Sequence, residues 1–131
     1  MANMRTEIRM QELESFPDYH ISDDGIVYTT KISPRYNPKG DLKVLKPRNH
    51  PSGYLYVGMF VGSGKTKVRV WRRVHRLVAE TYIGDLPTHM DVDHIDGDKH
   101  NNDYENLRII THQQNCVYAG ARRKNKKNEK N

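Results

Sequence analysis

The fold is decided by residues 91–115, which contain Asp91-Val-Asp-His-Ile-Asp-Gly97, then Glu105-Asn-Leu-Arg108, and finally Thr111-His-Gln-Gln-Asn115. The apolar residues and the Asp/Asn/Gly-rich connection predict a strand over 91–95, a loop over 96–106 and a returning strand over 107–110. Thr111 and Gln114 match a capping box, so a helix should begin there and run to about Ala121. This order of elements brings a carboxylate, an imidazole and two carboxamides into one short span.

These side chains are the ones that hydrolysis of a phosphodiester bond requires. His94 titrates near physiological pH, so its neutral form can take a proton from an attacking water. Asp93 offers an anionic oxygen to a metal, and Asn115 offers an amide oxygen from the first helical turn, where the helix dipole favours a phosphate. A metal site with only oxygen ligands favours Mg²⁺ or Mn²⁺ over Zn²⁺.

Strand geometry puts a condition on this site. Neighbouring residues of a regular strand point to opposite faces, which would separate Asp93 from His94. Both side chains reach one site only if the strand ends or twists sharply after them. Asp96-Gly97 is a sequence that permits such a turn.

The residues before position 84 predict two hairpins and a helix. Asp24-Gly25 lies between apolar residues and predicts the turn of the first hairpin. Residues 54–60 and 66–73 alternate in polarity, and a Gly/Ser turn at 62–64 joins them into the second hairpin. A short strand is expected over 42–45. Val74, Leu77, Val78 and Tyr82 repeat at helical spacing and predict a helix over 74–83, whose His75 is expected to be structural.

The second hairpin has a basic, aromatic face. In residues 66–73, Val68 and Val70 alternate with Lys67, Arg69, Trp71 and Arg73. A two-stranded ribbon fits the major groove of DNA, so this face is the expected DNA contact. The alternative is an ordinary exposed sheet face whose lysines guard an edge.

Charge is distributed unevenly along the chain, although its formal total is only +6 over 131 residues. Residues 41–76 have nine Lys/Arg against one Asp, residues 77–106 have eight Asp/Glu against one Lys, and residues 121–131 have six Lys/Arg against one Glu. Basic flanks around an acidic centre suit a polyanion that is held on both sides of a cation site. Each run taken alone is also consistent with a solvated surface. The single cysteine, Cys116, excludes an internal disulfide and a multi-cysteine zinc site.

The sequence resembles the HNH endonucleases of phages and mobile introns. The resemblance is carried by Val74-His-Arg-Leu-Val-Ala-Glu-Thr-Tyr82, Val92-Asp-His-Ile-Asp-Gly-Asp-Lys-His-Asn-Asn102, Glu105-Asn-Leu-Arg108 and Gln114-Asn115. Phe16-Pro-Asp-Tyr-His-Ile-Ser-Asp-Asp-Gly25 resembles the small module that often precedes that nuclease. The matches cover roughly residues 14–118.

The resemblance implies an α+β fold in which N-terminal antiparallel β-hairpins precede a ββα-metal core. We expect a β-rich DNA-binding module over 1–73, the nuclease core over 74–121, and a basic tail without regular structure over 122–131. By resemblance His94 is the general base, Asp93 and Asn115 hold one Mg²⁺ or Mn²⁺, and Asn106 braces the loop that follows the histidine. The family's reaction leaves 5′-phosphate and 3′-hydroxyl ends.

The expected partner is double-stranded DNA, bound by a monomer or weak dimer. The residues expected to contact it are Lys67, Arg69, Trp71, Arg72, Arg73, Arg122, Arg123 and Lys124. No stretch approaches the roughly 18 apolar residues of a membrane span and no signal peptide is visible, so a cytoplasmic protein is expected, in the host cell if a phage encodes it. The alternative function is a non-catalytic DNA- or RNA-binding or packaging accessory protein with an HNH-like core.

Overall fold

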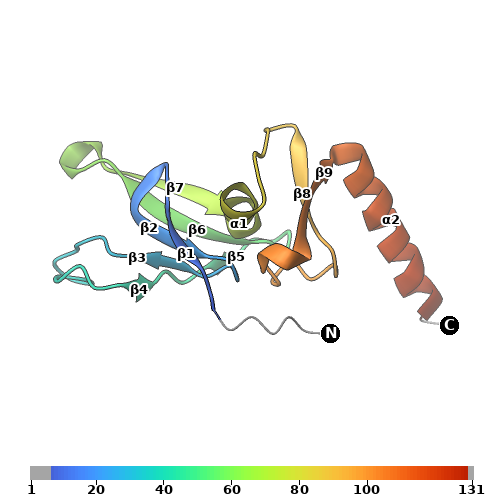
Figure 1. Cartoon of the computed structure of the whole chain (residues 1–131), viewed down its shortest axis with the longest axis horizontal. Coiled ribbons are helices and arrows are strands. Elements are labelled where there is room, and N and C mark those ends of the chain that lie inside the picture. Colours follow the sequence, from blue (N-terminus) through green and yellow to red (C-terminus); the bar gives the residue numbers. More distant parts are fainter. Residues whose placement is uncertain (1–6, 130–131) are drawn as a thin grey trace.

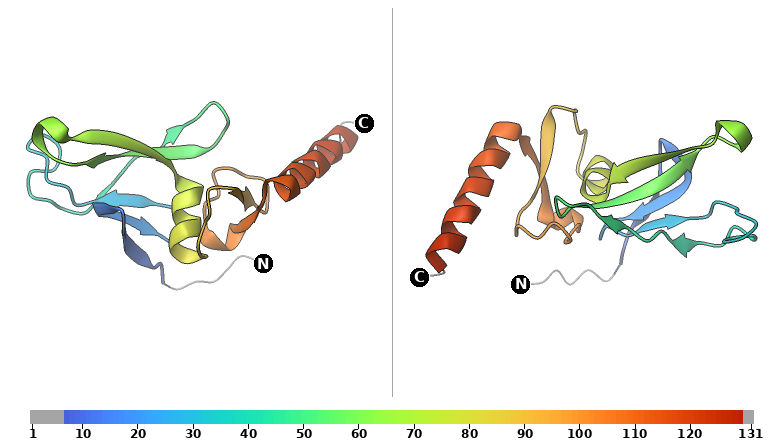
Figure 2. Two further views of the ribbon diagram at one scale, coloured as in Figure 1. Left: turned by 90° about the horizontal axis from the view of Figure 1, so that it is seen from above. Right: turned by 180° about the vertical axis from the view of Figure 1, so that it is seen from behind.

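The computed structural model describes residues 7–129, with side chains up to residue 123. Within that range, antiparallel strands form a four-stranded sheet in the order β1-β2-β3-β4, a three-stranded sheet in the order β5-β6-β7 and a two-stranded sheet of β8 and β9. Helix α1 lies between the first two sheets and the β8–β9 hairpin, and α2 projects at the far end (Figures 1 and 2). The α+β class with N-terminal hairpins is confirmed.

The first sheet contains β1 (Met10–Leu13), β2 (Phe16–Ser22), β3 (Val27–Thr29) and β4 (Lys43–Val44). The predicted turn at Asp24-Gly25 joins β2 to β3, and Gly25 has a φ of +91°, which a residue with a side chain rarely adopts. Three apolar residues of this hairpin, Tyr19, Ile21 and Val27, are at most 2% exposed. The hairpin therefore places its turn at the edge of the core.

The second sheet contains β5 (Arg48–Asn49), β6 (Leu55–Val61) and β7 (Val68–Arg73). A 3₁₀ turn, η1 (Gly64–Thr66), occupies the start of the strand predicted over 66–73, so the strand begins two positions later. The predicted alternation is confirmed in β6, where Val57 and Met59 are buried at 1% and 0% exposure, whereas in β7 Val70 is half-buried and Val68 is 56% exposed. The opposite face pairs Gly58 with Trp71 across the strands.

Helix α1 (Val74–Tyr82) joins the sheets to the hairpin through its apolar side. Val74, Leu77, Val78 and Ala79 are at most 4% exposed. A single cluster of buried residues includes side chains from β2, β6, α1, β8 and β9. Apolar burial is therefore continuous across residue 73, where the sequence predicted a boundary, and the division into two modules stays a prediction.

The last elements are β8 (Met90–His94), the 3₁₀ turn η2 (Tyr104–Asn106), β9 (Leu107–Thr111) and α2 (His112–Glu129). The capping box is confirmed, because Gln114 N donates to Thr111 Oγ1 at 3.1 Å and Thr111 N donates to Gln114 Oε1 at 3.0 Å. The helix does not end near Ala121 but continues to Glu129. The expectation of a tail without regular structure is therefore wrong as far as Glu129. No helix in the described residues has the length and apolar character to span a membrane.

Candidate active site

A cavity of about 140 Å³ lies where β8 meets α2. Asp93 and His94 line it from the end of β8, and Asn115 lines it from α2, together with Tyr54 and Lys99. Asp93 and His94 reach the same cavity although they are neighbours in a strand, because β8 ends at His94. Gly97 N closes a turn there by donating to the His94 carbonyl at 2.8 Å. Three of the four predicted site residues therefore share one cavity.

Asp93 is 3% exposed and lies between two arginines. Arg108, directly opposite on β9, donates from Nε to Asp93 Oδ2 at 2.9 Å. Arg122 on α2 donates from Nη1 to Oδ1 at 3.0 Å and from Nη2 to Oδ2 at 3.1 Å. Burial alone would raise the pKa of Asp93, but the hydrogen bonds from Arg122 and Arg108 outweigh it and hold that pKa below its ordinary value.

His94 is 4% exposed, and its ring Nε2 lies 2.7 Å from Oδ1 of Asn102, which is also buried. Its ring is tilted against those of His75 and Tyr54, at centroid distances of 5.1 and 5.9 Å. Burial lowers the pKa of His94, against the opposing effect of Asn102 and of nearby carboxylates. The imidazole is therefore neutral at neutral pH, which is the form that accepts a proton.

Asn106 does not line the cavity but fixes the loop that follows His94. Its amide nitrogen donates to Asp96 Oδ1 and to the Asn101 carbonyl, each at 2.9 Å, and its amide oxygen accepts from Asp96 N at 3.1 Å. Ile95 N also donates to the Asn106 carbonyl at 2.8 Å. These contacts connect both ends of the loop.

Asn115 lies between the first cavity and a second one of about 290 Å³, which it also lines. Its amide nitrogen donates to Asp91 Oδ2 at 3.0 Å, and His112 Nδ1 lies 2.8 Å from the same oxygen. Burial works to raise the pKa of Asp91, but the bonds from His112 and Asn115 outweigh it, so the pKa is lowered. The structure thus pairs Asn115 with Asp91, the residue two positions before Asp93 on β8.

The donors fit a hard divalent cation. The bond to Asp91 uses the amide nitrogen of Asn115, which turns its amide oxygen away from that carboxylate. Asp93 Oδ1 receives one hydrogen bond from Arg122, and a carboxylate oxygen has two lone-pair positions. In the described part of the chain, no group of three or more His, Cys, Asp or Glu side chains could hold an ion alone. A site with one carboxylate and one amide is of the kind that Mg²⁺ completes with waters and phosphate oxygens.

Several residues of the site were not identified from the sequence: Asp91, Asn102, Arg108, Tyr54 and Lys99. Lys99 lies over the Tyr54 ring at 4.6 Å, which places an ammonium group at the cavity. Two of these residues, Asp91 and Arg108, could have been identified from strand geometry. Asp91 shares a strand face with Asp93, and Arg108 is opposite Asp93 once the hairpin register is known.

The exposed face of β6 and β7 is a ladder of cations and aromatic rings. Arg48 and Arg69 lie over the Trp71 ring at 5.2 and 4.5 Å, and Lys67 lies over the Phe60 ring at 4.4 Å. A methyl group at Gly58 would come within 2.6 Å of Arg69 Nε, so glycine leaves room for the ladder. The structure therefore groups Lys67, Arg69 and Trp71 on one surface.

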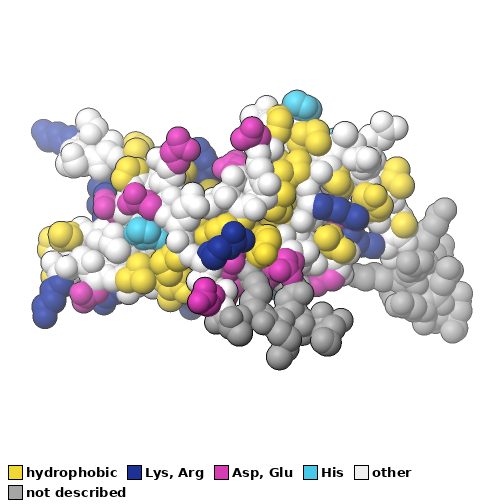
Figure 3. Space-filling model, viewed as in Figure 1, with side chains coloured by type: hydrophobic (Ala, Val, Ile, Leu, Met, Phe, Trp, Pro, Cys, Tyr) yellow, Lys and Arg dark blue, Asp and Glu magenta, His cyan; other side chains and the backbone are white. Residues whose placement is uncertain are grey.

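The other residues expected to contact DNA are placed differently. Arg73 lies over the Tyr54 ring at 4.9 Å, beside the cavities. Arg72 points to the opposite face of the sheet, where it lies over the Phe16 ring at 5.6 Å. Arg122 is held by Asp93, and Arg123 is exposed. The Lys124 side chain is outside the described residues. Lys and Arg side chains are visible at the end of the β6–β7 hairpin and beside α2 (Figure 3).

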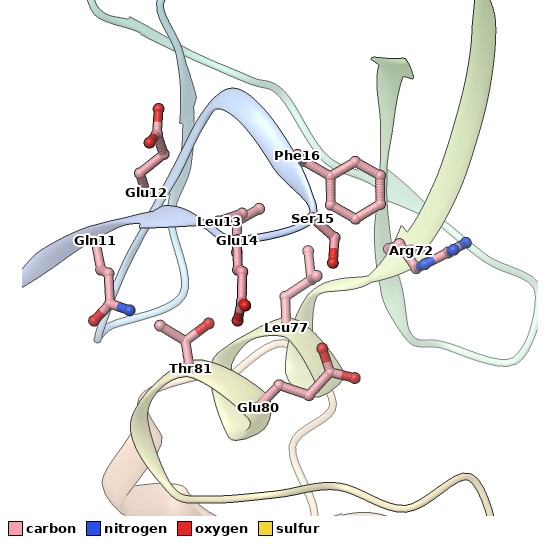
Figure 4. Close-up of a pocket in the computed structure, with 10 residues that line it drawn as sticks. All are labelled: Gln11, Glu12, Leu13, Glu14, Ser15, Phe16, Arg72, Leu77, Glu80 and Thr81. Carbon is pink, nitrogen blue, oxygen red and sulfur yellow. The ribbon is translucent and has the colours of Figure 1, made fainter. Parts of the chain in front are cut away.

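A larger cavity of about 370 Å³ lies away from Asp93, His94 and Asn115, between β1, β2 and α1 (Figure 4). Its lining includes the carboxylates of Glu12, Glu14 and Glu80, with Arg72 at one side. Three carboxylates around one opening repel a phosphate backbone. The smaller cavity beside His94 is therefore the better candidate for a site that contacts phosphate.

The model of the HNH endonuclease family matches residues 72–117, which include α1, β8, β9 and the start of α2. The chain is 38% identical over 93 residues to the DNA endonuclease I-HmuI of Bacillus phage SP01, and this match covers 71% of the chain. The solved structure of that HNH homing endonuclease superposes with a TM-score of 0.70 at 30% identity over 87% of the chain. The chain belongs to the HNH endonuclease family.

Two further relatives of this HNH chain carry the same family name. It is 34% identical over 112 residues to a putative HNH homing endonuclease from the SPbeta prophage of Bacillus subtilis, covering 83% of the chain. It is also 34% identical over 106 residues to an uncharacterised HNH endonuclease of Acanthamoeba polyphaga mimivirus, covering 81%. The chain spans 56% and 28% of the lengths of these two relatives, and 46% of I-HmuI.

Proposed function

We propose that the chain is a metal-dependent DNA endonuclease of the homing type that hydrolyses a phosphodiester bond. The observation that carries the proposal is the shared cavity, in which a buried carboxylate, a buried imidazole and a carboxamide converge from β8 and α2. A metal ligand and a general base within one water's reach of each other are what this hydrolysis needs.

His94 acts as the general base in this proposal. Its lowered pKa keeps the imidazole neutral at neutral pH, so it can accept a proton from water without first losing one. Asn106 holds the loop that begins after His94, through its bonds to Asp96 and Asn101. Lys99 at the cavity offers a positive charge to a non-bridging phosphate oxygen.

Asp93 and Asn115 are the proposed ligands of one Mg²⁺ or Mn²⁺ ion. When bound, such an ion polarises the phosphate and stabilises the leaving oxygen. Arg108 and Arg122 keep the Asp93 carboxylate ionised and in a fixed orientation, which a ligand oxygen requires.

The proposed substrate is double-stranded DNA, and the proposed assembly is a monomer or weak dimer. Support for DNA contact comes from the ladder of Lys67, Arg69 and Trp71 on the exposed face of β6 and β7. Arg73 connects this face to the cavity, because it is the last residue of β7 and lies over Tyr54. A ribbon with that face toward the major groove would direct the phosphate backbone toward His94.

A plasmid-nicking assay tests the proposal. The protein should convert supercoiled plasmid to nicked or linear DNA with Mg²⁺ or Mn²⁺, and EDTA should stop the reaction. H94A should remove cleavage and leave DNA affinity nearly unchanged. The matched control is H89A, since His89 is an exposed histidine before β8 and should not matter. Cleavage by H94A at the wild-type rate would refute the general-base role.

One observation favours the alternative of a non-catalytic DNA- or RNA-binding protein with an HNH-like core. Arg122 binds both oxygens of Asp93, which is the geometry of a structural ion pair. On this alternative the protein binds DNA or RNA but leaves the plasmid intact at every Mg²⁺ or Mn²⁺ concentration. Filter binding and the nicking assay on the same preparation separate the two functions.

A further inference from the structure

Asn102 is a buried polar residue in the loop between β8 and η2. Its side chain is 4% exposed, and its Oδ1 lies 2.7 Å from Nε2 of His94. An amide oxygen can only accept a hydrogen bond, so the imidazole must donate from Nε2. A neutral imidazole has one protonated nitrogen, so the contact leaves Nδ1 unprotonated.

The placement of His94 decides which of its ring nitrogens faces the cavity. Nε2 is directed into the protein, toward buried Asn102, while His94 also lines the cavity that contains Asp93. The nitrogen left for the cavity is therefore Nδ1, the one that can accept a proton. The hydrogen bond of one nitrogen of a histidine sets the role of the other.

Asn102 is in turn held by the first sheet. Gly25, in the turn between β2 and β3, lies against it so closely that a Cβ at Gly25 would be 2.7 Å from Asn102 Cβ and 2.9 Å from its carbonyl oxygen. Tyr104 N donates to the Asp23 carbonyl at 2.9 Å, which fixes the same loop to the same turn. This turn belongs to the first sheet and is remote in sequence from the histidine that it supports.

We propose that Asn102 is a positioning residue for His94, which its amide oxygen holds in the Nε2-protonated form, and that the β2–β3 turn keeps Asn102 in place. The inference rests on the proposed function for the role of His94 as a base. The hydrogen bond itself can be tested in the protein without metal or DNA. Failure of the two proposals is therefore distinguishable.

The first test is nuclear magnetic resonance of the full chain labelled with ¹⁵N in its histidine rings, at a pH where the rings are neutral. Wild-type protein should give an imidazole N–H signal from Nε2 of His94 that exchanges slowly with water, assigned by its loss in H94Q. N102L keeps the size but removes the acceptor, so the signal should exchange rapidly. N102D keeps an acceptor oxygen and should restore it. If circular dichroism shows that N102L is unfolded, the same measurement is made on N102A.

Two results would overturn the proposal. One is a wild-type spectrum in which Nδ1 of His94 carries the proton. The other is a slowly exchanging Nε2–H that persists unchanged in N102L. Neither reading depends on whether the protein cleaves DNA.

The second test is the rate of plasmid nicking. Displacing a catalytic group by about 1 Å can reduce a rate roughly 100-fold. N102L should therefore reduce kcat by about that factor with KM and DNA affinity unchanged, and N102D should recover part of the rate. A fall in DNA affinity with kcat unchanged would show that Asn102 serves binding and would overturn the positioning role.

The third test concerns the turn. Gly25 and Gly62 both have positive φ, at +91° and +85°, and a Cβ at either meets a carbonyl oxygen at 2.9 or 2.8 Å. Only the Gly25 contact is with Asn102. At a temperature where both variants are folded, G25A should speed exchange of the His94 N–H and G62A should not. Equal exchange in G25A and wild type would remove the turn from the proposal.

Discussion

Acid should destabilise this protein because it buries a neutral histidine. His75 is 4% exposed in α1, and its ring stacks on Tyr54 at 4.7 Å and 11°. Burial first, and then the charges of His94, Arg73 and Arg76, lower the pKa of His75 from 6.5 to about 3, while Asp91 acts in the opposite direction. The unfolded chain therefore binds a proton at His75 at a pH where the folded chain does not.

The sign and size follow from linkage. A histidine whose pKa is lowered in the folded state does not reduce the unfolding free energy above pH 6.5. The reduction grows as the pH falls from 6.5 toward 3. Between pH 7 and pH 5 the loss in unfolding free energy from His75 alone is about 2 kcal/mol, for a folded pKa of about 3. His94, whose pKa is also lowered, adds a loss of the same sign.

The assay is urea unfolding followed by the fluorescence of Trp71, the single tryptophan, at several pH values. H75F keeps a ring that can stack on Tyr54 but cannot be protonated, so it should lose about 2 kcal/mol less than wild type between pH 7 and pH 5. Comparison at pH 8, where neither protein titrates at this position, measures the packing effect of the substitution itself. Parallel pH dependence in H75F and wild type would refute the argument, because His75 would then be protonated equally in both states.

Three further substitutions test the site, the DNA surface and the last helix. R122A should lower the Mg²⁺ concentration for half-maximal nicking roughly fivefold, because Arg108 still orients Asp93 and removing one positive charge a few ångströms from the ion favours its binding by about 1 kcal/mol. R123A should leave that concentration unchanged. R69A should flatten the salt dependence of DNA binding by roughly 0.9 in slope for each phosphate that Arg69 neutralises, whereas R72A, on the other sheet face, should keep the wild-type slope in anisotropy titrations. T111A should lower the unfolding free energy by about 1 kcal/mol in urea, and T111S should restore most of it.

Local signals in the sequence predicted local structure correctly. The Asp24-Gly25 turn is found between β2 and β3, and the capping box starts α2 at His112. Each depends on a few adjacent residues whose hydrogen bonds or φ angles decide the conformation. The face of β6 and β7 was predicted for a similar reason, because side-chain direction alternates strictly along a strand.

Elements without an apolar pattern were missed or misjudged. Strand β1 (Met10–Leu13) is exposed except at Leu13, so no alternation marks it, and it pairs with β2 by backbone bonds. Helix α2 extends past Ala121 through a polar segment whose sequence has no apolar periodicity to indicate a helix. That part of the helix includes Arg122, which reaches Asp93 and the His94 carbonyl.

The sequence grouped three residues of the candidate site but did not predict the contacts that hold them. Family resemblance and chemistry brought together Asp93, His94 and Asn115, which share a cavity. The partners of these residues are distant in sequence: Arg122 for Asp93, and the turn at Gly25 behind Asn102 for His94. Contacts of that kind depend on how the sheets and α2 are oriented, and no local pattern specifies that orientation.

The two arginines beside Asp93 also give the site a charge suited to its proposed reaction. A buried carboxylate is costly unless it is paired, and Arg108 alone would neutralise it. Arg122 adds a second positive charge next to the same carboxylate, with Lys99 on the cavity wall. Attack of water on a phosphodiester adds one negative charge to the phosphate in the transition state. Positive charge in excess of what Asp93 needs therefore stabilises the transition state more than the bound substrate, which is the condition for raising kcat.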